Sequence, residues 1–281
     1  MLGSAIYDVF KDKYKLILTV RDSAKIVLLE KAYGDTSQHQ VELFDAQKVF
    51  DDFVVKKGYP GEYLDDFIKR VGAVDYVLNA IGVCIPYAME NPVLTYFINS
   101  SLPHILALKF GTKLIHITTD CVYNGTEGFP YDENSPKTPM DIYGASKSLG
   151  EPKTCLTIRT SIIGKELEGF TGFLEWFRQQ EGKAINGFSG HFWNGITTKQ
   201  YAKICDQIIQ KPENFPVSGL YHVFSTTVSK LQMLKTLQKK FAINCTINEN
   251  PDPRLNRTLA TVKTLNQQLS IPTFEQMVRE L

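Results

Sequence analysis

Hydrophobic positions in the first half of the chain follow two alternating patterns. Short, mostly apolar runs, typical of buried strands, occur at residues 15–20, 41–44, 75–81, 113–119 and 155–159. Between them lie longer stretches with the apolar spacing of helices, at residues 2–13, 23–32, between 44 and 70, and at about 91–110. Strands that are continuously apolar and alternate with helices favour a parallel sheet covered on both faces. The pattern therefore predicts an α/β fold with a doubly wound parallel sheet, in which ligands bind at the carboxyl ends of the strands.

The pattern loosens after residue 159. Helices are expected at 170–180, at about 199–210 and at 230–241, and a glycine-flanked segment at 182–195. We expect this region to form a smaller α/β portion. Gly164 and the pair Gly169 and Gly172 mark the boundary. The predicted division is therefore a first domain of residues 1–163 and a smaller portion of residues 164–281.

Composition and charge narrow the classes of function. The 281 residues carry 31 Lys and Arg against 30 Asp and Glu, a net charge of +1. This balance, without a long basic run, argues against a nucleic-acid or anionic-membrane binder. No run reaches the roughly 18 apolar residues of a membrane span. Five scattered cysteines form neither a CxxC pair nor a disulfide framework, so we expect a cytoplasmic protein without a metal site.

One motif beside the predicted crevice suggests proton transfer. In Tyr143-Gly-Ala-Ser-Lys147, the phenol and the ammonium are four residues apart and share one face of a helix. An ammonium beside a phenol lowers the pKa of the phenol, which suits proton exchange with an alcohol or ketone oxygen. Thr119, which ends the preceding strand, can donate a hydrogen bond to the same oxygen. The spacing alone is weak, because Tyr7 and Lys11 repeat it.

The residues around this motif carry a more specific signal. Residues 116–151 contain Thr-Thr-Asp, Tyr-Asn-Gly, Gly-Phe-Pro-Tyr-Asp-Glu and Tyr-Gly-Ala-Ser-Lys-Ser-Leu-Gly-Glu in that order. This segment resembles the active-site region of extended short-chain dehydrogenases, and most closely the RmlD-like dTDP-4-dehydrorhamnose reductase family. Asn79-Ala80, Asn99 and Arg159-Thr160-Ser161 extend the likeness. It covers nearly the whole chain and is densest in residues 75–165.

The resemblance implies a reaction and residue roles. Thr119, Tyr143 and Lys147 fall on the family's catalytic positions, and Asp120 lies where the family contacts substrate. The implied reaction is hydride transfer from a nicotinamide to the C4 ketone of a nucleotide-linked 6-deoxy sugar, for the synthesis of surface polysaccharide sugars. Tyr143 would protonate the alkoxide, Lys147 would hold the nicotinamide ribose, and Thr119 would polarise the carbonyl. Residues 1–163 would then be a Rossmann-like NAD(P)-binding domain, and residues 164–281 the substrate-binding portion.

The end of the predicted strand at residues 15–20, which takes the place of the second strand of a Rossmann sheet, bears on the choice of cofactor. An acid there suits the ribose hydroxyl of NAD, whereas a basic residue accommodates the 2′-phosphate of NADP. Arg21-Asp22 offers both signs, and a guanidinium binds phosphate bidentately, so NADP(H) is favoured over NAD(H). A surface pair between Arg21 and Asp22 is the alternative. Asp45 matches the position that contacts the adenine, with helix capping as its alternative. The predicted cofactor-binding set is Gly3, Arg21, Asp45, Asn79, Ala80, Tyr143 and Lys147.

Departures from the family leave the substrate open. The family carries a Trp after Arg-Thr-Ser, where this chain has Ile162-Ile163, which leaves room for a UDP-2-acetamido-2,6-dideoxy-4-ketohexose. Residues 187–198 are expected to form part of the substrate wall, with His191 and Trp193 as candidate contacts. Burial of Trp193 in the core and a surface position for His191 are the alternatives.

The motifs also bear on two other functions, and two cysteines lie near the predicted crevice. Some relatives of the family are non-catalytic binding or regulatory subunits, but the intact set of Thr119, Tyr143 and Lys147 favours an enzyme. A 4-epimerase or 4,6-dehydratase is disfavoured, because dehydratases carry Asp-Glu where this chain has Asp120-Cys121. We expect Cys84 and Cys121 to be small buried apolar residues. The expected partner is a nucleotide-linked deoxysugar, and a homodimer is possible.

The first residues raise a question about the sheet. A Rossmann fingerprint consists of a first strand, a glycine-rich turn and a helix whose N-terminus holds the pyrophosphate. The family's version of the turn ends in Gly-x-Leu-Gly, and this chain opens at Met1-Leu2-Gly3-Ser4, inside that turn. We therefore expect the sheet to lack its first strand and the start to be truncated. On this expectation, the upstream DNA encodes in frame an apolar strand followed by Gly-x-x-Gly.

Overall fold

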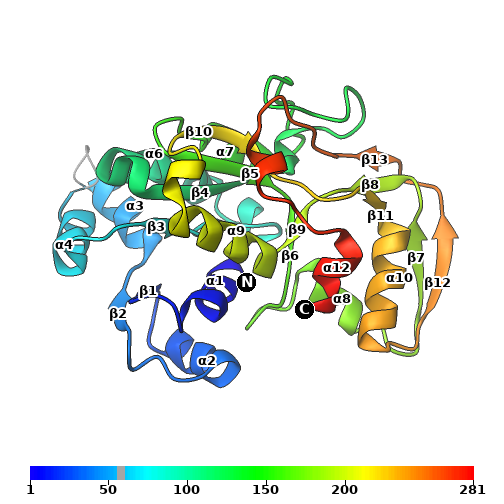
Figure 1. The fold of residues 1–281 in the computed structure, drawn as a ribbon, viewed down its shortest axis with the longest axis horizontal. Coiled ribbons are helices and arrows are strands. Elements are labelled where there is room, and N and C mark those ends of the chain that lie inside the picture. The colour runs from blue at the N-terminus through cyan, green and yellow to red at the C-terminus, as the bar shows by residue number, and fades with distance from the viewer. Residues whose placement is uncertain (56–60) are drawn as a thin grey trace.

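The centre of the molecule is a parallel sheet in two parts (Figure 1). The computed structural model describes residues 1–55 and 61–281. One part pairs β1 with β2, and the other has the order β10-β5-β4-β3, with all neighbours parallel. The strands are β1 (Ile17–Val20), β2 (Gln40–Leu43), β3 (Val77–Asn79), β4 (Leu114–Thr119), β5 (Leu156–Thr160) and β10 (Gly219–His222). The predicted α/β fold with a parallel sheet is confirmed.

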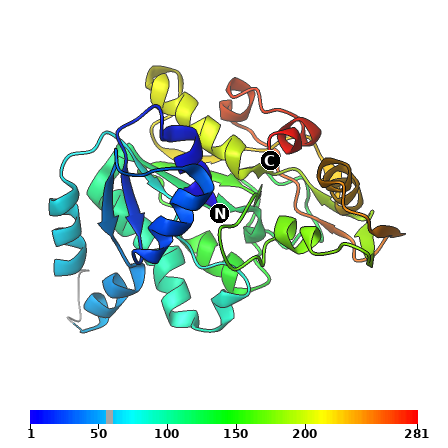
Figure 2. The ribbon, with the colours of Figure 1, turned by 90° about the horizontal axis from the view of Figure 1, so that it is seen from below.

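The two parts of the sheet are not joined by strand pairing. Within the described ranges, no strand pairs with the second edge of β1 or of β3. In the usual order of a doubly wound sheet, the first strand lies between the second and the fourth. The strands β1 and β3 occupy those two flanking positions, and Figure 2 shows the β1–β2 pair beside the larger sheet. The sheet is therefore Rossmann-like without its first strand, as expected.

Helices cover both faces of the sheet. Successive side chains of its strands point to opposite faces, and both sets are apolar. On β4, Ile115 and Ile117 face a core that includes Phe10 and Ile204, whereas Leu114 faces a second core with Leu102. The first core packs under α1 and α9, and the second under α3, α4 and α6. The helices of this part are α1 (Leu2–Phe10), α2 (Ala24–Tyr33), α3 (Ala46–Val55), α4 (Glu62–Val71), α5 (Pro92–Tyr96), α6 (Leu102–Phe110), α7 (Ile142–Leu149) and α9 (Thr198–Gln210).

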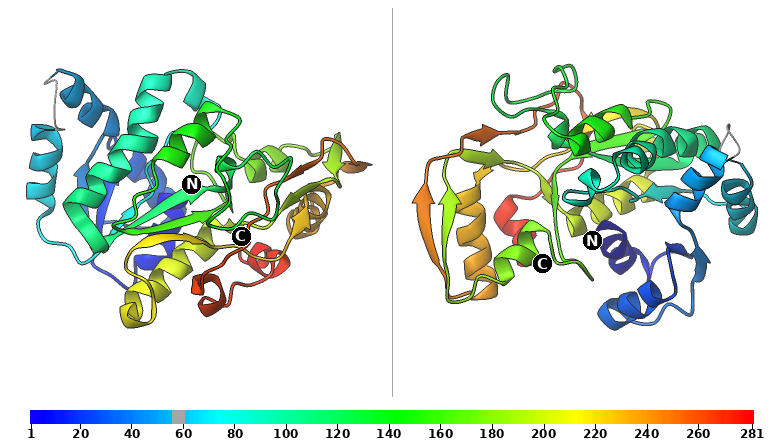
Figure 3. Two further views of the ribbon diagram at one scale, coloured as in Figure 1. Left: turned by 90° about the horizontal axis from the view of Figure 1, so that it is seen from above. Right: turned by 180° about the vertical axis from the view of Figure 1, so that it is seen from behind.

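The smaller part consists of short strands backed by helices (Figure 3). One sheet pairs β7 with β12, and another has the order β11-β8-β13. Phe177, Trp193, Leu237 and Phe274 belong to the core between these strands and α8, α10 and α12. The bounds are β7 (Ala184–Phe188), β8 (His191–Trp193), β11 (Val228–Ser229), β12 (Thr246–Asn250), β13 (Leu255–Asn256), α8 (Phe173–Arg178), α10 (Lys230–Phe241) and α12 (Phe274–Arg279). Helix α11 (Leu265–Gln268) instead packs against β10 of the larger sheet.

The chain crosses between the two parts more than once. The short parallel pair of β6 (Ile162–Ile163) and β9 (Ile196–Thr197) lies at the crossing. Both α9 and β10 follow the predicted boundary at residue 164, yet β10 pairs with β5 and α9 packs against α1. The division at residues 163 and 164 therefore coincides only with the first crossing. The helix expected at 91–110 is interrupted by a π-helical turn, Phe97–Ser101, between α5 and α6.

Candidate active site

Local structure brings α7 to the carboxyl end of β4. Helix α7 begins at Asp141, whose Oδ1 accepts a hydrogen bond of 2.7 Å from the Gly144 amide. A Cβ at Gly144 would lie 2.2 Å from the carbonyl oxygen of Cys121, so only glycine allows this close approach. Cys121 lies in the turn that follows Thr119. The contact therefore holds the first turn of α7, including Tyr143, beside the end of β4.

Tyr143 and Thr119 meet at this point. The Thr119 hydroxyl lowers the pKa of the Tyr143 phenol, but burial outweighs this effect and raises that pKa well above its usual value. Cys84 and Cys121 raise the pKa further. The sequence predicted a phenol pKa below its usual value because of Lys147. That prediction is wrong, because burial raises the pKa of Tyr143. Tyr143 therefore keeps its proton at neutral pH.

Lys147 is the second predicted group on α7, and its side chain is only 5% exposed. Its Nζ donates a hydrogen bond of 3.0 Å to the carbonyl oxygen of Ile117 on β4. Burial lowers the pKa of Lys147 to about 8, against the opposing effects of Cys84 and Glu151. At neutral pH the ammonium is thus charged and directed at the end of the strand that carries Thr119.

The loop after β3 forms another side of this site. Asn99 is fully buried; its Oδ1 accepts a hydrogen bond of 2.9 Å from the Val83 amide, and its Nδ2 donates one of 2.9 Å to the Val83 carbonyl. Its Nδ2 also donates to Ser146 Oγ at 3.1 Å, which ties the loop to α7. A Cβ at Gly82 would lie 3.8 Å from Lys147 Nζ. The backbone at Gly82 therefore runs close to the ammonium.

Asp120 and two cysteines complete the immediate surroundings. Asp120 is 6% exposed; burial raises its pKa, while Arg257, Ser161 and Lys230 lower it. Thr119 Oγ1 donates a hydrogen bond of 3.2 Å to Asp120 Oδ1. The expectation that both cysteines are buried is wrong, because Cys84 is exposed and Cys121 half-buried. Both cysteines raise the pKa of Tyr143, so two thiols that are not fully buried lie close to the phenol.

Comparison with known families assigns the chain. Residues 88–269 match the family described as the RmlD substrate binding domain, and residues 1–154 match the NAD dependent epimerase/dehydratase family. The chain belongs to the RmlD-like family of extended short-chain dehydrogenases. The spore coat polysaccharide biosynthesis protein SpsK of Bacillus subtilis (strain 168) is 30% identical over 142 residues, 47% of this chain and 48% of SpsK. This match spans about half the length of that relative.

Two further relatives carry the name of one enzyme. The dTDP-4-dehydrorhamnose reductase of Escherichia coli (strain K12) is 25% identical over 215 residues, 69% of this chain and 71% of the enzyme. The crystal structure of dTDP-4-dehydrorhamnose reductase from Bacillus anthracis str. Ames, in complex with NADP, superposes with a TM-score of 0.68. It is 17% identical and covers 95% of this chain and 98% of that one. This likeness establishes the shared fold of the RmlD-like chain.

Two cations of this RmlD-like chain were not singled out by its sequence. Lys230, the first residue of α10, and Arg257, which follows β13, both lower the pKa of Asp120. Arg257 Nη1 donates to Cys121 Sγ at 3.5 Å, and its Nε donates to the Tyr123 carbonyl at 3.0 Å. The sequence offered a clue only for Lys230. It is the first residue of a predicted helix, where the helix dipole disfavours a cation. Arg257 lies 136 residues from Cys121, so no local pattern predicts their contact.

The two candidates on β8 have different surroundings. His191 is half-buried, and burial together with Lys230 and Arg257 lowers its pKa to about 4, so it is neutral at pH 7. Trp193 is 5% exposed and packs edge-on against Phe274, with ring centroids 5.6 Å apart. Trp193 therefore belongs to the smaller core, which is the alternative that the sequence offered for it. His191 stays a candidate contact.

The residues predicted to hold the adenosine end of a cofactor divide into two groups. Arg21 is exposed just after β1 and has no ion-pair partner in the part of the chain that the structure describes. Asp22 Oδ1 instead accepts a hydrogen bond of 3.0 Å from the Ala24 amide at the start of α2, so the alternative pair with Arg21 is not formed. Asp45 Oδ1 accepts one of 2.9 Å from the Gln47 amide, which is the capping alternative.

The remaining predicted cofactor residues lie close to the first core. Asn79 is 5% exposed, its Nδ2 lies 3.0 Å from His116 Nδ1, and its Oδ1 accepts from the Ile81 amide at 3.1 Å. These contacts orient the side chain within the protein and leave one Nδ2 hydrogen unassigned, so the cofactor contact of Asn79 stays a prediction. Ala80 is half-buried beside it. Gly3 is exposed in the first turn of α1, where a Cβ would meet nothing within 4 Å.

The residues near Lys147 fit the ribose of a nicotinamide cofactor. A side chain at Gly82 would project toward Lys147 Nζ and Asn99 Oδ1, so the glycine leaves that space to a ligand. The ammonium of Lys147 and the phenol of Tyr143 are the donors that ribose hydroxyls require. At the other end, the exposed guanidinium of Arg21 forms no ion pair with a described residue. Lys147, Tyr143 and Arg21 would thus hold the two ends of the cofactor.

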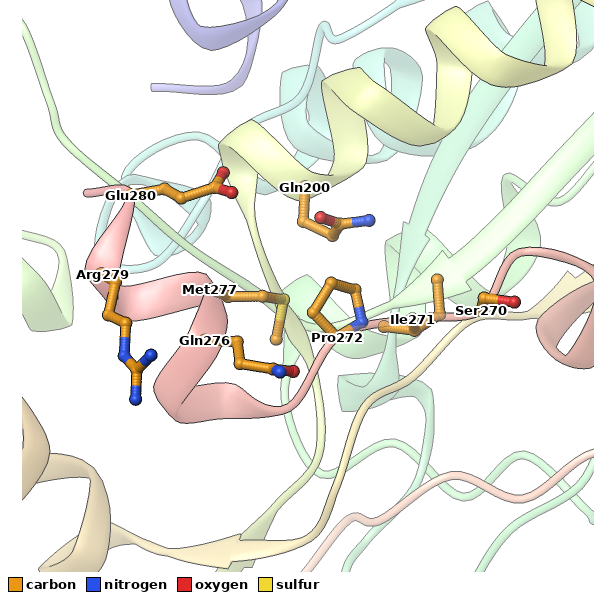
Figure 4. Close-up of a pocket in the computed structure, with 8 residues that line it drawn as sticks. All are labelled: Gln200, Ser270, Ile271, Pro272, Gln276, Met277, Arg279 and Glu280. Carbon is orange, nitrogen blue, oxygen red and sulfur yellow. The ribbon is translucent and has the colours of Figure 1, made fainter.

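Other features of the RmlD-like chain lie apart from this site. A cavity of about 530 Å³ lies between α9 and α12, where Figure 4 shows Gln200 across from Met277 and Pro272. A second cavity, of about 450 Å³, lies beside β8 and β13 and includes Phe129 and Phe192. Among residues 1–55 and 61–281, no group of three or more His, Cys, Asp or Glu could hold a metal. In the same ranges, no helix has the length and apolar character to span a membrane.

Proposed function

We propose that this chain reduces the C4 ketone of a nucleotide-linked 4-keto-6-deoxy sugar, with NADP(H) as the redox partner. The product would serve the synthesis of surface polysaccharide sugars. The observation that carries the proposal is the convergence of Thr119, Tyr143 and Lys147 at the carboxyl end of β4. The names of SpsK and of the dTDP-4-dehydrorhamnose reductases support the choice of substrate class.

Tyr143 acts as the proton donor in this reaction. When bound, the nicotinamide supplies a hydride to the carbonyl carbon, and the electron pair of the carbonyl bond moves to the oxygen. The Tyr143 hydroxyl then transfers its proton to that oxygen and gives the alcohol. A donor must hold its proton at neutral pH, and the raised pKa of the buried phenol meets this requirement. On substrate binding, the single Thr119 hydroxyl proton turns from Asp120 Oδ1 to the same oxygen and polarises the carbonyl.

Lys147 and Asp120 position the two reactants. The Lys147 ammonium is charged below a pKa of about 8, and its hydrogen bond to the Ile117 carbonyl fixes its direction before a ligand binds. It binds the hydroxyls of the nicotinamide ribose. Asp120, held against Thr119 Oγ1, accepts hydrogen bonds from sugar hydroxyls beside the reacting carbon.

Arg21 supports NADP(H) over NAD(H). Its guanidinium is exposed at the end of β1 and forms no ion pair with Asp22, whose Oδ1 accepts a hydrogen bond from the Ala24 amide. A guanidinium binds a phosphate through two parallel hydrogen bonds, which a ribose hydroxyl cannot match. The 2′-phosphate of NADP is therefore the group that Arg21 binds.

Product analysis tests the proposed function directly. The purified chain is incubated with NADPH and a panel of dTDP- and UDP-linked 4-keto-6-deoxy sugars, including a 2-acetamido-2,6-dideoxy sugar, and the products are identified by NMR. Reduction at C4 of one substrate, lost in Tyr143→Phe, is the expected result. Tight NADPH binding with no product from any substrate would favour the alternative of a non-catalytic binding subunit.

A further inference from the structure

Two cations beside Asp120 have no carboxylate partner. In the described part of the chain, Lys230 and Arg257 form no ion pair within 4.0 Å, and Lys230 Nζ donates no hydrogen bond. The Lys230 ammonium lies 4.4 Å from the centre of the Phe173 ring and 5.9 Å from that of Trp193. Two rings thus hold the Lys230 charge in place without neutralising it.

Arg257 is fixed in a similar way. Its Nε donates to the Tyr123 carbonyl and its Nη1 to Cys121 Sγ, two weak or neutral acceptors, while Nη2 makes no hydrogen bond to a described residue. The contact with Cys121 places the guanidinium beside the turn that follows Thr119. The Nη2 edge of the planar Arg257 guanidinium is therefore available to a ligand close to Thr119.

The charge around these residues favours an anion. Lys230, Arg257 and Asp120 each act on the pKa of another member of the group, and His191, which both cations influence, is neutral at pH 7. The local charge of the four side chains is thus about +1. Lys230 also stands at the first position of α10, where the helix dipole makes a cation unfavourable. An anion between the cations would relieve both their mutual repulsion and this dipole effect.

We propose that Lys230 and Arg257 form the subsite that binds the diphosphate of a nucleotide-linked substrate. The inference rests on the proposed function for the identity of the ligand and deepens it by naming the residues that hold the nucleotide. The subsite lies beside Asp120, on the start of α10 and on the segment that follows β13. A sugar whose diphosphate is held there has its ring beside Asp120 and its carbonyl toward Thr119 and Tyr143.

Calorimetric binding without cofactor tests the subsite. The probes are dTDP and UDP, with thymidine and uridine as neutral counterparts, titrated into the wild-type chain, Lys230→Met and Arg257→Met. A charge-assisted contact is worth about 1.5–3 kcal/mol, so each variant should raise the Kd of the diphosphates at least about tenfold. Nucleoside binding should change less than about twofold. Matched controls are Lys235→Met, exposed on the same helix, and Arg254→Met, exposed on the same segment; both should bind like wild type.

The outcomes separate this inference from the proposed reaction. Unchanged diphosphate binding in both variants would overturn the subsite even if the chain reduces a ketosugar. Loss of diphosphate binding in both variants would support it even if no turnover is found. If a variant fails to fold, the test is the dependence of binding on salt concentration, measured with the wild-type chain. The Kd of dTDP should rise with KCl while that of thymidine does not, and equal salt effects would overturn the proposal.

Discussion

The ammonium of Lys147 donates a 3.0 Å hydrogen bond to the carbonyl oxygen of Ile117, two residues before Thr119 on β4. This bond fastens α7 to the strand that ends at the proposed site. The phenol of Tyr143, one turn earlier on α7, is thereby held at a fixed place relative to Thr119. The three groups are thus arranged before any ligand binds, which lowers the cost of reaching a reactive geometry.

Removing the Tyr143 hydroxyl should abolish most of the turnover. In Tyr143→Phe the ring still fills its place, but no proton can be given to the alkoxide. We expect kcat to fall by roughly 10²–10⁴-fold, the usual contribution of a general acid, with NADPH binding nearly unchanged. Steady-state kinetics and fluorescence titration of NADPH measure the two quantities. Retention of more than about a tenth of the turnover would contradict the role of Tyr143.

Cofactor affinity should depend on pH through Lys147. Burial lowers the pKa of this ammonium to about 8, so the charge is present below that pH and lost above it. We expect the Kd of NADPH to rise above about pH 8, by up to about tenfold per pH unit. Lys147→Met should bind NADPH more weakly at pH 7 and lose this dependence, whereas the exposed Lys153→Met should keep it. Identical pH profiles for wild type and Lys147→Met would rule out the ribose contact.

Arg21→Ala should distinguish the two cofactors. If the guanidinium binds the 2′-phosphate, its loss removes a contact that NADPH makes and NADH lacks. We expect the KM for NADPH to rise roughly ten- to a hundredfold, and that for NADH to change less than about threefold. The exposed Lys31→Ala is the control for a general change in surface charge. Equal effects on both cofactors would show that Arg21 does not bind the 2′-phosphate.

A buried histidine should make stability depend on pH. His222 is fully buried; Arg159 Nη1 donates to its Nε2 at 2.8 Å, so its Nδ1 must be the atom that donates to the Ala260 carbonyl at 2.8 Å. Burial and the Arg159 charge lower the His222 pKa to about 4. The unfolded chain binds this proton below pH 6.5 and the folded chain only below about pH 4. The histidine therefore lowers stability as pH falls through that window.

Denaturant unfolding from pH 7 to pH 4 measures the effect of His222. The free energy of unfolding of the wild-type chain should fall, with a contribution from this residue of up to about 1.4 kcal/mol per pH unit. His222→Gln lacks the titrating ring, so its stability should fall less steeply between pH 6.5 and 4, whatever its stability at pH 7. Parallel curves for the two proteins would show that His222 titrates normally.

The sequence by itself determined the elements whose signal is local. The alternation of apolar strands and amphipathic helices predicted the parallel sheet, because side-chain period reflects backbone conformation within a few residues. The spacing of Tyr143 and Lys147 placed them on one face of a helix, and the helix α10 was predicted with its observed bounds. The expectation that the first strand is missing from the sheet rested on the turn at Met1–Ser4, and among the described residues no strand pairs with the second edge of β1 or of β3.

The tertiary structure decided what depends on contacts between distant residues. Strand β10 follows the predicted boundary yet completes the first sheet, because pairing with β5 depends on the path of the whole chain. Trp193 was a candidate contact until the core around Phe274 enclosed it. The pKa of Tyr143 rises chiefly because of burial, which no spacing encodes, and Cys84 and Cys121 raise it further. Lys230 and Arg257 face Asp120 only because folding brings three separate segments together, and charge acts through space rather than along the sequence.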